Sequence, residues 1–129
     1  MTIAGDRSKA IVHRLFEDVW NRGDMSATVD ILAHPEGVQR YVAEFRAAFP
    51  DVHHEVREMI AEGDAVAVTW TAQATHTGHW RGVAPTGKVV TWTGITIAHL
   101  QDGKIADHHT LWDRLSFAEQ LGTVLPQSW

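Results

Sequence analysis

Residues 89–113 have the sequence VVTWTGITIAHLQDGKIADHHTLWD, which contains the clearest pattern of secondary structure in the chain. Its first half, residues 89–100, is rich in β-branched side chains, which favour extended strands. Asp102-Gly103 follows, a pair typical of tight hairpin turns, and residues 104 to about 113 provide the returning strand. The stretch therefore predicts two long antiparallel strands joined by a tight turn.

Two more strands are expected before this hairpin. Apolar and polar residues alternate from position 52 to 60, Glu62-Gly63-Asp64 is a hairpin signal, and residues 65–77 continue the alternation. Side chains two positions apart on a strand share one face of the sheet. The inward face is therefore predicted to carry Val52, His54, Val56, Glu58 and Ile60 from the first strand, and Val66, Val68, Trp70, Ala72, Ala74 and His76 from the second.

Three amphipathic segments come before the strands. Apolar residues recur with helical spacing from about residue 6 to 20. Asp24 is a suitable N-cap for a short second helix, and a third helix begins near Pro35 and ends before Pro50. A short last helix is expected over residues 116–122. Helices followed by an antiparallel meander predict an α+β fold: a cone-shaped, curved sheet of about four strands packed against three N-terminal helices.

The composition limits the classes of function. With 129 residues, 44% of them hydrophobic, residues 1–129 are expected to form a single domain with its own core. The absence of cysteine excludes disulfides and a thiol nucleophile. A net charge of -5 with scattered basic residues argues against a nucleic-acid partner. Nothing in the sequence resembles a signal peptide or a membrane span, so a cytoplasmic protein without a membrane partner is expected.

Several segments, in their order and spacing, resemble the SnoaL-like polyketide cyclases, a group within the nuclear-transport-factor-2-like superfamily. The resemblance covers most of the chain. It is carried by Asn21-Arg22-Gly23-Asp24, HPEGVQRYVAEFRAAFPD (34–51), MIAEGDAVAVTWTAQATHTG (59–78), PTGKVVTWTGI (85–95) and DGKIADHHTLWDRLSFAEQLG (102–122).

The resemblance implies a homodimeric or higher oligomeric cone whose pocket accepts a hydrophobic small molecule. Its best-known members close polyketide rings by an intramolecular aldol reaction without a metal or organic cofactor. An aspartate and a histidine serve those cyclases, and the ungapped match places them at Thr110 and Thr96. A threonine hydroxyl can donate a hydrogen bond to a carbonyl, but its pKa is far too high for a general base near neutral pH. The family mechanism therefore requires a different base here.

His108 is the nearest candidate for that base. A regular strand from Ile105 to Asp113 turns His108, Thr110 and Trp112 toward the same face as the family's acid-base position. An imidazole with an ordinary pKa near 6.5 suits proton abstraction beside a carbonyl, and Thr96 or Thr110 would hold the enolate oxygen. The alternative is that His108 makes a hydrogen bond within the sheet end and orients the chain.

Other polar and aromatic residues are candidates for the site. Asp113 either joins His108 and Thr110 as a catalytic group or anchors the strand end and caps the following helix. The three strand tryptophans form either an aromatic wall for a flat ligand or core packing, and His54 is either a ligand contact or a satisfied core histidine. His76, with His79 and Trp80, flanks a loop that is a candidate entrance. The predicted substrate-binding residues are His54, Trp70, His76, Trp92, Thr96 and Trp112.

The remaining histidines are assigned to surfaces. Asp107 and His109 lie on the opposite face of the last strand, where an interface role is favoured. Metal binding needs three or more convergent donors, and Asp107 with His109, or His76 with His79, supplies only two, so no metal is predicted. His13, His34, His53 and His99 are expected at the surface or an interface. The short Ala33-His34 segment, where relatives usually have a longer one, implies a more open mouth, a wall supplied by another subunit or a diverged substrate.

Three functions are compatible with these residues. The leading hypothesis is a cofactor-independent enzyme, an aldol cyclase or isomerase, that acts on a hydrophobic, carbonyl-bearing small molecule with His108 as acid-base. The second is the cofactor-free hydroxylation that some members of the family perform, which differs in its dependence on oxygen. The third is a non-catalytic small-molecule-binding or dimerisation module, consistent with threonine at both acid-base positions.

Overall fold

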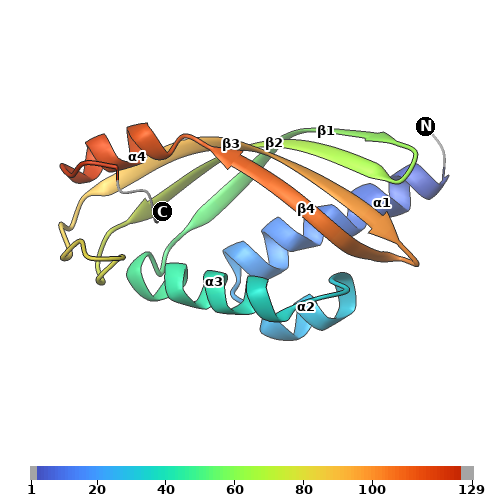
Figure 1. Ribbon diagram of the computed structural model, residues 1–129, viewed down its shortest axis with the longest axis horizontal. Helices are drawn as coiled ribbons and strands as arrows, with labels where there is room; N and C mark the ends of the chain where they lie inside the picture. Colours follow the sequence, from blue (N-terminus) through green and yellow to red (C-terminus); the bar gives the residue numbers. More distant parts are fainter. Residues whose placement is uncertain (1–2, 126–129) are drawn as a thin grey trace.

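The computed structural model describes residues 3–125 as a meander of strands preceded by helices. Figure 1 shows the order of the elements along the chain. None of the helices in residues 3–125 combines the length and the apolar character that a membrane-spanning helix requires. The elements are α1 (Ile3–Arg14), its π-helical continuation η1 (Leu15–Asn21), α2 (Met25–Ile31), α3 (Glu36–Ala48), β1 (His53–Glu62), β2 (Ala65–Thr75), β3 (Val89–Gln101), β4 (Lys104–Trp112) and α4 (Arg114–Leu121).

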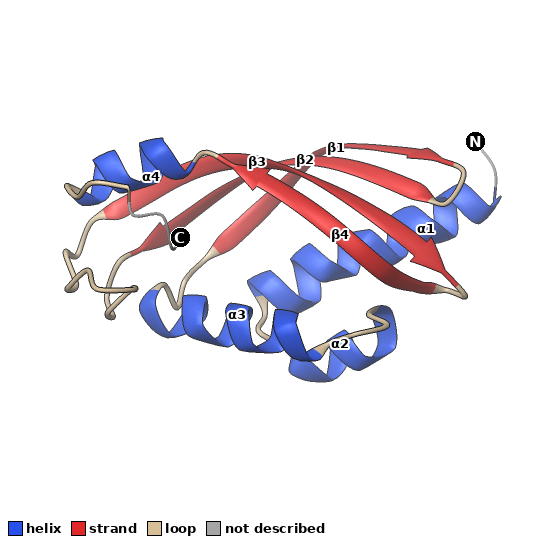
Figure 2. Ribbon diagram, in the orientation of Figure 1, coloured by secondary structure: helices blue, strands red, loops and turns tan. Residues whose placement is uncertain are grey.

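The four strands form one antiparallel sheet in the order β1-β2-β3-β4. The sheet is curved, with α1, α2 and α3 on one side and α4 after the end of β4 (Figure 2). This arrangement confirms the predicted α+β fold with a curved sheet against N-terminal helices. The concave side of the sheet and the helices therefore enclose the space in which a site can form.

A β-bulge in β1 changes which side chains face the helices. The pairing of β1 with β2 shifts between Val56 and Glu58, so one extra residue interrupts the alternation. Beyond the bulge, Met59 and Ala61 pack against the core, whereas Ile60 is 57% exposed. The prediction that Glu58 and Ile60 face inward is therefore wrong, because a slip of one residue turns the subsequent side chains to the other face.

Two hydrogen bonds connect Asn21, the last residue of η1, to His54 near the start of β1. The Asn21 side chain donates from Nδ2 to the His54 carbonyl oxygen at 2.9 Å, and its Oδ1 accepts from the His54 backbone N–H at 2.6 Å. Asp24 then caps α2, as predicted, by accepting hydrogen bonds from the backbone N–H groups of Ser26 and Ala27. These contacts hold the helical layer in place at one end of the sheet.

Candidate functional site

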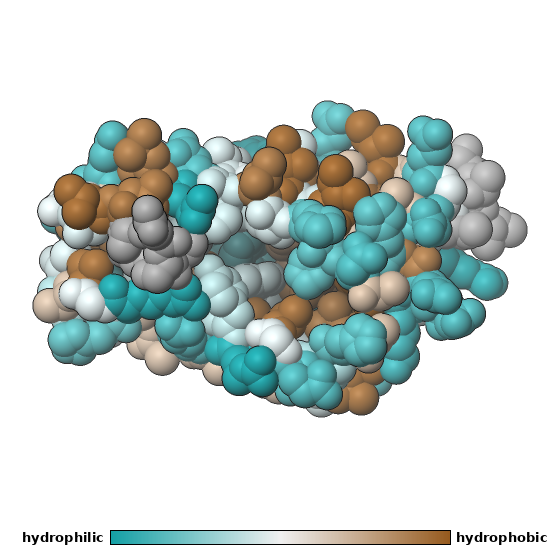
Figure 3. All heavy atoms as spheres, viewed as in Figure 1, coloured by the Kyte–Doolittle hydropathy of each residue, from teal (hydrophilic) through white to brown (hydrophobic). Residues whose placement is uncertain are grey.

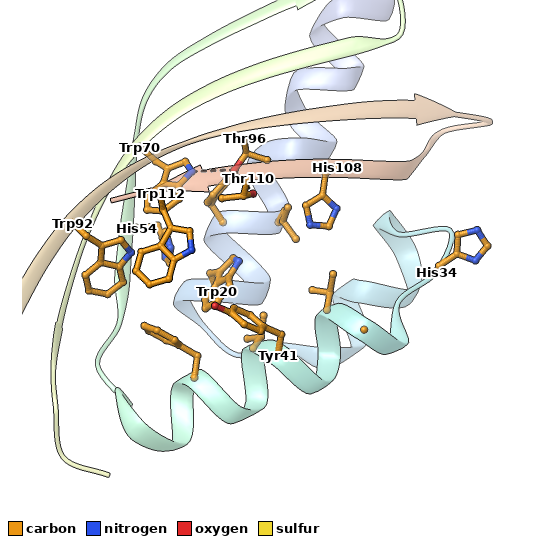
Figure 4. A pocket seen from close by; sticks show the side chains of 16 residues that line it. Trp20, His34, Tyr41, His54, Trp70, Trp92, Thr96, His108, Thr110 and Trp112 are labelled. Carbon is orange, nitrogen blue, oxygen red and sulfur yellow. Dashed lines mark hydrogen bonds between the residues drawn. The ribbon is translucent and has the colours of Figure 1, made fainter. Parts of the chain in front are cut away.

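A cavity of about 500 Å³ lies between the concave face of the sheet and the helices. Its walls come from η1, α3 and all four strands, and Figure 4 shows the lining side chains. The surface is hollowed near the centre of the molecule, between β4 and α3 (Figure 3). The volume is within the range of small-molecule sites.

Seven of the nine predicted site residues line this cavity. They are His54 from β1, Trp70 from β2, Trp92 and Thr96 from β3, and His108, Thr110 and Trp112 from β4. The three residues from β4 are two positions apart in the sequence, because alternate residues of a strand share a face. The structure thus brings side chains from every strand to one enclosed space.

The other two predicted residues lie outside the cavity. Asp113 caps α4, because its Oδ1 accepts a hydrogen bond from the Ser116 backbone N–H at 3.0 Å. His76 is fully buried and stacks on Phe49 with ring centroids 5.0 Å apart. Its Nδ1 lies 3.2 Å from the backbone nitrogen of Thr86, which donates to it. Asp113 is therefore placed as a helix cap rather than a catalytic group, and His76 as a core residue rather than an entrance residue.

The helical side of the cavity contains aromatic residues that the sequence does not single out as site residues. Trp20 and Phe16 from η1 and Tyr41 from α3 line the wall opposite the sheet. In a π-helix each turn holds more residues than in an α-helix, so η1 changes the faces that its side chains present. His34, expected at the surface, is exposed and also borders the cavity near Gly37.

Thr96 and Thr110, the two threonines that line the cavity, are direct cross-strand neighbours. Thr96 of β3 pairs with Thr110 of β4, and their Oγ1 atoms lie 2.9 Å apart. The Trp70 indole Nε1–H donates to Thr96 Oγ1 at 3.1 Å. Thr96 is buried, whereas Thr110 is exposed toward the cavity. Thr110 is therefore the threonine that is open to a ligand.

His108 is half-buried and projects from β4 toward α3 (Figure 4). Burial lowers the pKa of His108 below its ordinary value, the neighbouring His109 lowers it further, and Asp107 opposes the shift. The ring is therefore neutral at pH 7 and able to accept a proton. Within residues 3–125 no hydrogen bond to this ring is found, so the alternative of a sheet-anchoring histidine lacks the bond that it requires.

His54 lies at the most aromatic part of the cavity. It is 5% exposed, and its ring centroid is 4.9 Å from that of Trp20, 4.8 Å from that of Trp70 and 5.8 Å from that of Phe16. Burial lowers the pKa of His54 to about 3, and the charge of His53 adds to the effect. In the described part of the chain, Nδ1 is buried without a hydrogen-bond partner, so His54 is not a satisfied core histidine.

The cavity wall, as far as the structure describes it, carries no carboxylate, ammonium or guanidinium group. Its described lining residues include no aspartate, glutamate, lysine or arginine. Burial lowers the pKa of His54 and of His108, which keeps both rings neutral, and burial raises the pKa of Tyr41, which keeps its hydroxyl protonated. Across residues 3–125, no group of three or more histidines and carboxylates is arranged to hold a metal ion. The wall offers neutral donors, neutral acceptors and aromatic surface.

The sequence model of SnoaL-like polyketide cyclases matches residues 10–121. The chain belongs to the SnoaL-like polyketide cyclase family. Among curated proteins, no sequence matches this chain.

Solved structures of the same fold include family members. A candidate polyketide cyclase from Acidithiobacillus ferrooxidans is 28% identical, with a TM-score of 0.83 over 95% of this chain and 98% of that one. AclR, a candidate hydroxylase from Streptomyces galilaeus, is also 28% identical, with a TM-score of 0.80 over 96% of this chain and 87% of that one. IdmH, a candidate polyketide cyclase from Streptomyces antibioticus, is 25% identical, with a TM-score of 0.80 over 90% of this chain and 99% of that one.

This SnoaL-like chain has threonine at two positions of the cavity wall that the resemblance makes important. The positions that the resemblance assigns to the acid-base aspartate and histidine are occupied by Thr110 and Thr96. Their hydroxyls are bonded to each other rather than to a charged partner. His108, two residues before Thr110 on the same strand face, is the titratable side chain that borders them.

Proposed function

We propose that this protein is a cofactor-independent enzyme that acts on an uncharged, hydrophobic molecule bearing a carbonyl group, of the aldol cyclase or isomerase type. One observation carries the proposal: a neutral His108 and a hydroxyl-bearing Thr110 project from the same face of β4 into one aromatic cavity. A proton acceptor beside a hydrogen-bond donor is the arrangement required for enolisation.

In the proposed reaction His108 removes a proton from the carbon next to the carbonyl. The electrons of that C–H bond form the enolate, whose oxygen accepts a hydrogen bond from the Thr110 hydroxyl. In a cyclase, the enolate carbon attacks a second carbonyl of the same molecule and forms a C–C bond. The imidazolium of His108 then returns the proton to the new alkoxide, and in an isomerase it returns the proton to another carbon.

The aromatic residues would bind and orient the substrate. Trp92 and Trp112 lie side by side on the sheet side of the cavity and Trp20 lies on the helical side, and these flat apolar surfaces suit a planar ring system (Figure 4). A carboxylate ligand would lose its hydration without a cationic partner among the described lining residues, at a cost of several kcal/mol. An uncharged ketone, ester or quinone avoids that cost, so we assign the substrate to this class.

Cofactor-free hydroxylation is the second candidate. It is favoured by the 28% identity to AclR, which spans 96% of this chain. The same neutral base and aromatic cavity would serve an electron-rich aromatic substrate. This reaction consumes oxygen, whereas an aldol cyclisation or an isomerisation does not.

We also propose a homodimer that forms through the outer face of the sheet. Ile95, Ile97 and Leu111 project from β3 and β4 on the side away from the helices and are 51%, 42% and 82% exposed. Ile95 and Leu111 are cross-strand partners, so they form a continuous apolar surface. Sedimentation of the wild type and of Leu111→Asp tests this, with a dimer expected for the first and a monomer for the second.

Turnover of flat aromatic ketones, esters and quinones, with and without oxygen, tests the proposed chemistry. Products formed equally well without oxygen support the cyclase or isomerase, and products formed only with oxygen support the hydroxylase. Tight binding without turnover of any compound in either atmosphere would refute the enzyme and leave a binding module. Binding is followed separately by quenching of the cavity tryptophans, so that failure to bind and failure to react are distinguished.

A further inference from the structure

We infer that Trp70 and Thr96 form a hydrogen-bond relay that holds the Thr110 hydroxyl as a donor to the ligand's carbonyl oxygen. The inference rests on the proposed function and adds two positioning residues to it. In this arrangement only Thr110 touches the ligand oxygen. The sequence predicts Trp70 as part of an aromatic wall or of the core. In the relay it acts on Thr96 as a hydrogen-bond donor through its indole N–H.

The relay is a continuous chain of hydrogen bonds across three strands. Nε1 of Trp70, on β2, donates to Oγ1 of Thr96, on β3, at 3.1 Å. Oγ1 of Thr96 lies 2.9 Å from Oγ1 of Thr110, on β4. Figure 4 shows the three side chains next to one another, with Thr110 nearest to His108. The chain runs from a buried indole to the cavity.

The direction of the relay is determined by the chemistry of its first member. An indole nitrogen only donates, so Thr96 Oγ1 must accept from Trp70. Thr96 is 1% exposed, and among residues 3–125 its hydroxyl has no partner other than Trp70 and Thr110. A buried hydroxyl proton without an acceptor costs about 1–3 kcal/mol. The Thr96 proton therefore goes to Thr110, which acts as its acceptor.

This direction decides what Thr110 offers to a ligand. Since Thr110 Oγ1 accepts from Thr96, its own proton remains free to be donated into the cavity. Hydrogen bonds in such a chain polarise one another, so the terminal hydroxyl becomes a stronger donor than an isolated threonine. The relay favours a ligand that presents an acceptor oxygen at this point, such as a ketone, ester or quinone carbonyl.

Gly94 allows the first bond of the relay to form. Gly94 is the cross-strand partner of Trp70, and the indole ring lies directly against it. A Cβ atom at position 94 would lie 2.6 Å from Cη2 and 2.8 Å from Cε2 of that ring. Only glycine therefore lets the ring lie along β3 with Nε1 within reach of Thr96, two residues further on.

The carbonyl stretching band of bound 2-acetylnaphthalene tests the relay. The ketone is used in its ¹²C and ¹³C carbonyl forms, and the difference infrared spectrum separates its band from the protein amide band. We expect Thr110→Val to shift the band of the bound ketone to higher frequency. Thr96→Val should shift it in the same direction by a smaller amount, although Thr96 does not touch the ketone. Thr96→Ser restores the hydroxyl and should restore the wild-type band.

The control is Thr93→Val, which removes a hydroxyl from the outer face of the same strand. An unchanged band in Thr96→Val would overturn the relay while the proposed substrate class stands. Failure of the wild type to bind the ketone would overturn both.

A second measurement needs no ligand. The indole ¹H–¹⁵N signal of Trp70, assigned by its loss in Trp70→Phe, should move in Thr96→Val and in Thr110→Val but not in Thr93→Val. A signal that stays fixed in Thr110→Val would contradict the coupling between the two bonds.

Discussion

Gly94→Ala should destabilise the protein because a methyl group at that position meets the indole ring of Trp70. The new Cβ would lie 2.6 and 2.8 Å from two ring carbons, where ordinary contacts measure 3.4–4 Å. Trp70 is 4% exposed, so the ring has little room to move away. Overpacking of this kind costs about 1–3 kcal/mol, whereas replacing a glycine inside a strand by alanine gains only about 0.5–1 kcal/mol. The net effect is a loss.

Urea unfolding in two backgrounds measures this effect. In Trp70→Phe the outer ring of the indole is absent, so adding Gly94→Ala there should cost less than adding it to the wild type. Gly37→Ala is the matched control, because no atom lies within 4 Å of the Cβ that it adds and the residue is in α3. Equal costs of Gly94→Ala in both backgrounds would refute the proposed contact between the added Cβ and the Trp70 ring.

Three further predictions concern single residues. Asn21→Ala removes two hydrogen bonds to the His54 backbone and should lower the free energy of unfolding by about 1–3 kcal/mol in urea titrations. Asp113→Ala should cost about 0.5–2 kcal/mol through loss of the α4 cap, with unchanged ligand quenching of tryptophan fluorescence. His54 binds its proton more weakly in the folded protein than in the unfolded chain, so its contribution to stability is lost as pH falls from 6.5 toward about 3. The slope is about 1.4 kcal/mol per pH unit for one proton, and His54→Phe should remove it, as measured by unfolding at pH 5 and 6.

Much of the fold can be predicted from short-range patterns in the sequence. The alternation in residues 89–113 and the Asp102-Gly103 turn determine the β3–β4 hairpin, and Asp24 marks the start of α2. The bulge after Val56 could not be predicted in this way, because it depends on how β1 packs against its partner strand. The π-helical η1 has the same apolar stripe as an α-helix, so its changed geometry leaves no separate signal in the sequence.

The candidate site is predictable on the strands and less so on the helices. The two-residue repeat places His108, Thr110 and Trp112 on one face, and these residues line the cavity. Trp20 and Tyr41 were not predicted, because an apolar helical stripe has the same period whether it fills a core or borders a cavity. The orientation of a residue near a strand end depends on the helix or loop that comes next in the chain. Asp113 therefore caps α4, and His76 is enclosed by the loop after β2.

Hydrogen–deuterium exchange at a carbon next to a carbonyl tests His108 most directly. A suitable probe is 1-(naphthalen-2-yl)butane-1,3-dione in D₂O, monitored by NMR as deuterium replaces hydrogen between its two carbonyls. We expect the wild type to accelerate the exchange and His108→Ala to lower the enzymatic rate by about 10²–10⁴-fold. His13→Ala, which changes an exposed histidine of α1 that does not line the cavity, should keep the wild-type rate. Equal rates for the wild type and His108→Ala would contradict the assignment of His108 as the base.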